Sequence, residues 1–136
     1  MKTSIRSVLS GLVLVGSINV AQADEFKMSF EWGDIPLCTT GSPNIVDNPV
    51  FTLSGVPEGT KFIAFRLTDL DVPGYNHGGG TVEYTGQTII EPGAFSYKSP
   101  CPPNGSHTYE WTASADDSDS IFSDTLAKAS ASVSYP

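Results

Sequence analysis

Two histidines and two aspartates are the residues of this sequence best suited to chemistry. Each of the histidines, His77 and His107, lies beside a stretch rich in glycine or proline. Asp69 and Asp71 lie two residues apart at the end of an apolar stretch, so both carboxylates point the same way if a strand continues through them. We therefore expect a pocket lined by two carboxylates and one or two imidazoles, with the three glycines at 78–80 permitting close approach of the backbone.

These four side chains are compatible with several functions. Two imidazoles and two carboxylates could bind a transition metal or serve a hydrolase, whereas a single histidine on an apolar face is more often a hydrogen-bonded core residue. The sequence contains no G-x-S-x-G or H-E-x-x-H motif, and we predict no enzymatic activity. The acidic stretch 116–120 lacks the ligand spacing of an EF-hand and is interpreted as a solvated turn. A protein-interaction module with a vestigial pocket is a further alternative.

Strands are the elements expected to position these groups. Apolar residues alternate with polar ones over 26–32, 61–69 and 107–114, which is the period of a strand with one buried face. Further short strands are expected at 50–54, in two places between 82 and 97, and at 131–135, with a long loop over 33–49 and a short helical turn at 126–129. Many short strands joined by segments rich in proline and glycine predict an all-β antiparallel sandwich with minimal helix.

The N-terminal 23 residues have the features of a signal peptide. Lys2 and Arg6 precede an apolar stretch, which is too short to cross a bilayer and is followed by small residues suited to cleavage. We expect one mature domain over 24–136, periplasmic or secreted, with no transmembrane segment after cleavage. The identity of any protein partner is left open.

The mature chain would be strongly acidic. Cleavage would remove two of the 7 basic residues and none of the 15 acidic ones, so the net charge would fall from −8 to −10. Nucleic acids and anionic lipid surfaces are bound by clustered lysine and arginine. This charge therefore speaks against nucleic acid as a partner.

Cys38 and Cys101 are the two cysteines of the chain, and both lie in the expected mature domain. In an oxidising compartment a single intrachain disulfide is the default, and neither cysteine has the C-x-x-C spacing of a metal site. In the chain-entropy model, a bridge that closes roughly 60 residues contributes ~4 kcal/mol to stability.

Two segments resemble the signatures of a known family. Asp-Leu-Asp-Val-Pro at 69–73, followed by His77, and Ser-Pro-Cys-Pro-Pro-Asn-Gly-Ser-His-Thr-Tyr at 99–109 are similar to the two signature segments of the phosphatidylethanolamine-binding protein family, whose bacterial members are called Raf kinase inhibitor-like. The stretch 48–60 is similar to the segment that precedes the first signature. The resemblance covers roughly residues 26 to 113.

This resemblance implies a β-sandwich with a small pocket for phosphate, acetate or a phospholipid headgroup, and neither catalysis nor a cofactor. The short C-terminal part implies that flanking helices are reduced, which would leave an open site. The residues that the resemblance places in the pocket are Asp69, Asp71, His77, Pro102, His107 and Tyr109.

Two aspartates beside an anion present an electrostatic conflict, because carboxylates repel phosphate. We expect that a carboxylate accepts a hydrogen bond from an imidazole, orients it and holds it protonated, so that the other ring N–H is presented to the anion. The imidazole would then separate the anion from the carboxylate.

Overall fold

The structure is a computed structural model that describes residues 11, 13–18 and 23–136. The expected signal peptide over 1–23 therefore lies largely outside the described residues. In its described part, Val13, Leu14, Val15 and Ile18 are exposed by 82% to 89% and so do not pack against the domain. Among the described residues, no helix has the length and apolar character needed to span a membrane.

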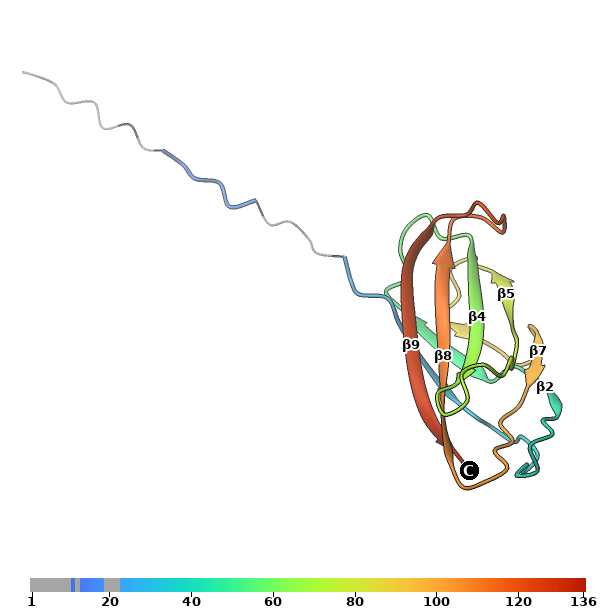
Figure 1. The fold of residues 1–136 in the computed structure, drawn as a ribbon. Helices are drawn as coiled ribbons and strands as arrows, with labels where there is room; N and C mark the ends of the chain where they lie inside the picture. The colour runs from blue at the N-terminus through green and yellow to red at the C-terminus, as the bar shows by residue number, and fades with distance from the viewer. Residues whose placement is uncertain (1–10, 12, 19–22) are drawn as a thin grey trace, which may run out of the picture.

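The described part of the chain contains nine β-strands and no helix (Figure 1). Their bounds are β1 Lys27–Glu31, β2 Ile45–Asp47, β3 Val50–Ser54, β4 Phe62–Asp69, β5 Gly79–Glu83, β6 Ile89–Ile90, β7 Ser96–Lys98, β8 His107–Asp116 and β9 Thr125–Tyr135.

These strands form two main sheets and a short ribbon. The larger sheet has the strand order β5-β4-β8-β9, and it lies in front in Figure 1. Behind it lies the sheet β1-β3-β6, while β2 and β7 pair separately. All neighbouring strands run antiparallel, so the predicted antiparallel sandwich is confirmed.

The core lies between the two sheets and is rich in aromatic rings. The ring of Phe51 from β3 stacks on Phe65 from β4 at 4.3 Å between centroids and meets the edge of Trp111 from β8 at 5.1 Å. Every second residue of β4, beginning at Ile63, is buried and faces this core. The alternation seen in the sequence is therefore the burial pattern of the strand, and Asp69 is the last residue on that buried face.

Three local predictions were wrong. Where two strands were expected between 82 and 97, the structure has three, β5, β6 and β7, because β6 is a separate short strand that pairs with β3. The helical turn expected at 126–129 is part of β9, which pairs with β8 along most of its length. The long pairing gives hydrogen-bond partners to backbone N–H and C=O groups that a single helical turn would leave unpaired. Pairing between strands therefore outweighs the local helix propensity of this segment. The loop expected over 33–49 contains the short strand β2.

The packing of Phe51 can be tested against another phenylalanine of the same chain. Phe51 is fully buried, whereas Phe122, in the β8–β9 connection, is 87% exposed. We expect Phe51→Ala to lower the free energy of unfolding by about 3–5 kcal/mol, and Phe122→Ala to change it by less than about 0.5 kcal/mol. Urea unfolding followed by tryptophan fluorescence measures both, and equal effects of the two substitutions would contradict this core.

Candidate functional site

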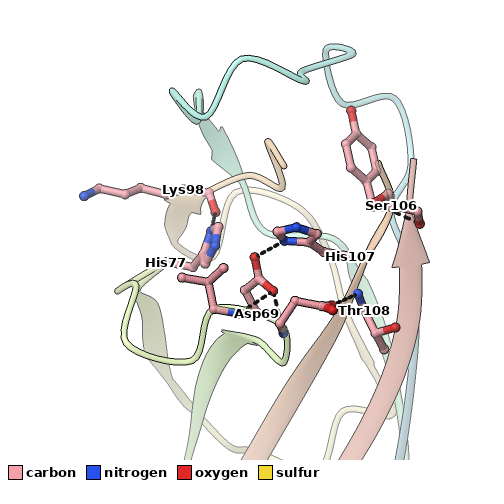
Figure 2. A network of polar contacts seen from close by, with 9 residues as sticks. Asp69, His77, Lys98, Ser106, His107 and Thr108 are labelled. Atoms are coloured by element: carbon pink, nitrogen blue, oxygen red, sulfur yellow. Dashed lines mark hydrogen bonds and ion pairs between the residues drawn. The ribbon is translucent and has the colours of Figure 1, made fainter. Parts of the chain in front are cut away.

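The pairing of β4 with β8 brings Asp69 and His107 to the same end of the sandwich. Asp69 lies opposite Tyr109 in the sheet, and His107 precedes Tyr109 by two residues on the same face of β8. The Nδ1 atom of His107 lies 2.7 Å from Oδ2 of Asp69 (Figure 2). This contact is the imidazole–carboxylate pair that the electrostatic argument requires.

The second oxygen of Asp69 holds the loop that follows β4. Its Oδ1 accepts hydrogen bonds from the backbone N–H groups of Asp71, at 2.9 Å, and Val72, at 3.1 Å. Burial alone would raise the pKa of this carboxyl group, but the bonds from His107 and the two N–H groups hold its pKa below the usual value of 3.8. Asp69 is therefore a carboxylate whose two oxygens both accept hydrogen bonds within the protein.

His77 is attached to β7 through both its backbone and its ring. Its carbonyl accepts from the N–H of Lys98 at 2.9 Å, and its Nδ1 lies 2.8 Å from the carbonyl oxygen of Lys98 (Figure 2). The ring is 3% exposed and lies 4.7 Å from the ring of Tyr75 and 5.5 Å from that of Tyr109. Burial lowers the pKa of His77, against the opposing effects of the Lys98 carbonyl and the charge of Asp69.

A cavity of about 190 Å³ lies over these groups. Five of the six residues predicted to line a pocket do line it, namely Asp69, His77, Pro102, His107 and Tyr109. They come from the end of β4, the β4–β5 loop, the segment before β8, and β8 itself.

Asp71 is the predicted residue that does not line the cavity. The strand ends at Asp69, so the two-residue alternation that was expected to align both carboxylates stops there. The Asp71 side chain is exposed, and its Oδ2 accepts a hydrogen bond from the N–H of Thr108 at 2.8 Å. Asp71 therefore fixes the loop after β4 against the start of β8.

The three consecutive glycines also do not line this cavity. Gly79 and Gly80 begin β5 and pair with β4. A Cβ atom on Gly79 would lie 1.9 Å from the carbonyl oxygen of Phe65, and one on Gly80 would lie 2.5 Å from the Phe95 ring. Glycine is therefore required here for packing between strands, rather than for approach to a ligand.

The sequence did not identify most of the residues that form the walls of the cavity. Gly41, Pro43, Val72, Tyr75 and Pro103 line it together with the five predicted residues and Cys101, which lies in the segment expected to form the pocket wall. Most of these side chains are apolar and lie on loops, where neither periodicity nor charge marks them. For Val72 and Tyr75, the feature of the sequence that could have indicated a place in the cavity wall is that they lie close to His77 along the chain.

The predicted disulfide is present and forms part of the cavity wall. Cys38 and Cys101 are bonded, with their Cα atoms 4.6 Å apart and both side chains buried. The N–H of Gly41 donates to the carbonyl of Cys101 at 3.1 Å. The hydroxyl of Tyr135 accepts from the N–H of Cys38 at 3.0 Å, so the last strand also supports this wall.

The hydroxyl group of Tyr109 is buried and has no hydrogen-bond partner among the described residues. Burial and the negative charge of Asp69 raise the pKa of Tyr109, so the hydroxyl keeps its proton. The oxygen has almost no exposed surface, so Tyr109 lines the cavity through its ring rather than through its hydroxyl.

Three residues of the described chain bring possible metal ligands close together. One atom each of Asp69, Asp71 and His107 lies within 4.8 Å of the others, while His77 is not part of this group. Nδ1 of His107 is hydrogen-bonded to one oxygen of Asp69, and one oxygen of Asp71 accepts from Thr108. A metal ion that bound through these same atoms would have to replace these hydrogen bonds.

Comparison with known proteins identifies the fold. No family model and no curated protein matches the sequence. Among solved structures, a homologue of phosphatidylethanolamine-binding proteins from Chlamydia trachomatis, CT736, matches with a TM-score of 0.58 at 18% identity, covering 82% of this chain and 97% of that one. YbcL of E. coli, described as a member of the mammalian phosphatidylethanolamine-binding protein family, matches with a TM-score of 0.60 at 20% identity, covering 82% and 98%. The chain therefore has the fold of phosphatidylethanolamine-binding protein homologues.

The buried imidazole of His77 predicts a defined dependence of stability on pH. Its pKa is below 6.5 in the folded protein, so at pH values under 6.5 the unfolded chain takes up a proton that the folded one does not. The free energy of unfolding should therefore fall as the pH is lowered from about 6.5. Urea titrations at a series of pH values should show a shallower fall in His77→Asn, and identical slopes in the two proteins would refute this assignment.

Proposed function

We propose that this chain is an exported, non-catalytic binding protein of the phosphatidylethanolamine-binding protein family, of the bacterial Raf kinase inhibitor-like kind. Its ligand is a small anion or a phospholipid headgroup, bound in the cavity beside Asp69 and His107. The shared fold, the two signature segments and the lining of the cavity by five of the six expected residues support this proposal.

The hydrogen bond between His107 and Asp69 is the observation that carries the proposal. When His107 is protonated, its Nδ1–H donates to the carboxylate and its Nε2–H is left for a ligand. The oxygens of Asp69 accept from three protein donors, and its charge is offset by the imidazolium. An anion can then bind near an aspartate without facing an unpaired negative charge.

The size of the cavity favours a small ligand or headgroup. Sites for drug-sized molecules typically measure ≈ 300–1,000 Å³, whereas this cavity measures about 190 Å³. A tetrahedral oxyanion or a short headgroup matches this volume better than a larger metabolite does.

The rim of the cavity is compatible with a lipid as the source of the headgroup. Val72 and Tyr75 line the cavity and are also partly exposed, and Leu70, between β4 and Val72, is 47% exposed. Apolar side chains around a polar floor could contact the acyl chains or glycerol of a lipid whose headgroup enters the cavity.

Two observations support export to the periplasm or the cell exterior. Disulfides persist in those compartments and are rare in the cytosol, and the Cys38–Cys101 bond forms part of the cavity wall. The apolar side chains at 13–18 are exposed rather than buried in the domain, which is compatible with removal of this segment as part of a signal peptide.

A metal ion is the second candidate ligand, because Asp69, Asp71 and His107 offer one ligand atom each within 4.8 Å. Two carboxylates and one imidazole suit a divalent transition metal. Stoichiometric zinc or copper in protein purified without chelators would favour this candidate over an anion.

The anion site is tested by titrating the mature protein with inorganic phosphate in a calorimeter at mildly acidic pH. His107→Asn keeps an N–H donor to Asp69 and removes Nε2–H, and we expect it to weaken phosphate binding by about tenfold or more, as for a hydrogen bond to a charged group. Lys128→Gln also removes a positive charge, but from a residue that does not line this cavity, so it should leave the affinity unchanged.

Equal affinities of the wild-type protein and His107→Asn would contradict the anion site. That result would favour the alternative of an interaction module with a vestigial pocket.

A further inference from the structure

The two imidazoles of the cavity differ in the partner of their Nδ1 atom. In His107 this partner is the carboxylate of Asp69, at 2.7 Å. In His77 it is the carbonyl oxygen of Lys98, at 2.8 Å. A carbonyl oxygen can only accept a hydrogen bond, so Nδ1 of His77 must carry a hydrogen.

The neutral ring of His77 consequently has a lone pair on Nε2. A neutral imidazole carries one N–H, and here it is used by the Lys98 carbonyl. A flip of the ring would break that hydrogen bond. His77 is only 3% exposed, and its ring packs against the rings of Tyr75 and Tyr109. The position of the hydrogen is therefore fixed by the surrounding structure.

The groups facing His77 keep this ring neutral. Burial disfavours the charged form, the nearby carboxylate of Asp69 favours it, and the charge of Lys98 opposes it, with burial the largest of these effects. The Lys98 ammonium group lies over the Tyr75 ring, 5.5 Å from its centroid. Tyr109, on the other side, keeps its proton and carries no charge.

The lone pair on Nε2 is available to a ligand. No residue in the described part of the chain donates a hydrogen bond to this atom. It is also not among the fully buried unpartnered polar atoms, which are the hydroxyls of Tyr97 and Tyr109 and the indole nitrogen of Trp111. Because His77 lines the cavity and its Nδ1 is used by Lys98, Nε2 is the ring nitrogen left for a ligand.

We propose that the cavity selects an anion whose head carries a hydrogen-bond donor, and that Nε2 of His77 accepts the hydrogen of that donor. This inference rests on the proposed function and narrows its ligand class. The simplest such ligands are singly protonated phosphate and phosphomonoesters, which have one P–OH group beside their negatively charged oxygens.

The two imidazoles of the cavity then have separate roles. His107 Nε2–H donates to an unprotonated oxygen of the ligand, while His77 accepts from its P–OH group. An anion without a hydrogen would place an oxygen lone pair against the lone pair of Nε2. A site that pairs a specific ligand hydrogen rejects analogues that lack it, because its own buried group is then left unpaired.

Methylphosphonate and methanesulfonate form a matched pair of probes for this selectivity. At mildly acidic pH both have one methyl group, three oxygens and a single negative charge, but the phosphonate alone carries an O–H group. We expect the wild-type protein to bind methylphosphonate roughly tenfold more tightly, as one hydrogen bond would give. In His77→Asn, whose side-chain amide can still donate to the Lys98 carbonyl, the two ligands should bind equally.

Three further ligands distinguish a free phosphate compound from a lipid headgroup. Methyl phosphate has a P–OH group, dimethyl phosphate has none, and glycerophosphoethanolamine has none but carries an ammonium group and two glycerol hydroxyls as other donors. Selective binding of methyl phosphate supports the inference and indicates a phosphomonoester. Binding of glycerophosphoethanolamine but not of dimethyl phosphate, with loss in His77→Asn, supports it and indicates a headgroup whose ammonium or hydroxyl group is the donor.

The results that would overturn this inference are separable from failure of the proposed function. Equal binding of methylphosphonate and methanesulfonate by the wild-type protein would overturn the role of His77 and leave an anion site standing. Failure of every probe to bind would overturn both. The comparison within the wild-type protein remains decisive if His77→Asn does not fold.

Discussion

The buried carboxylate of Asp69 connects the hydrophobic core to the polar floor of the cavity. It ends the buried face of β4, and an unpaired charge at such a position would cost several kcal/mol. Three protein donors offset that cost: the ring of His107 and the backbone N–H groups of Asp71 and Val72. The same bonds orient the His107 ring and shape the loop that carries Val72, so the floor and part of the wall depend on one carboxylate.

The opposite wall depends on covalent chemistry rather than on strand pairing. The segment around Cys101 lies between β7 and β8, and the segment around Cys38 lies between β1 and β2, so neither belongs to a sheet. The disulfide joins them, and the Tyr135 hydroxyl accepts from the backbone of Cys38. The proposed export therefore bears on the cavity itself, because an oxidising compartment preserves the bond that holds this wall.

The periodicity of the strands allowed correct predictions for residues on β4 and β8, whereas the positions of side chains in the loops were harder to predict. Alternation in β4 and β8 correctly placed Asp69 and His107 on buried faces, and antiparallel pairing then brought them together. Asp71 was wrongly predicted to line the cavity because β4 ends two residues before it. At that point the side chain of Asp69 accepts hydrogen bonds from backbone N–H groups of the following loop, and strand periodicity does not predict such bonds. The partner of His77 is 21 residues away in sequence, so the position of its ring hydrogen could not be inferred before the fold was known.

The central claim is that the ring hydrogen of His77 is fixed on Nδ1, which leaves Nε2 bare, while Nδ1 of His107 donates to Asp69. Nitrogen-15 NMR of the histidine rings in the free protein, at neutral pH, reads these positions directly. The account predicts that His77 is neutral, with its hydrogen on Nδ1 and a bare Nε2, and that Nδ1 of His107 carries the hydrogen shared with Asp69. A His77 ring with its hydrogen on Nε2, or with hydrogens on both nitrogens, would contradict the account.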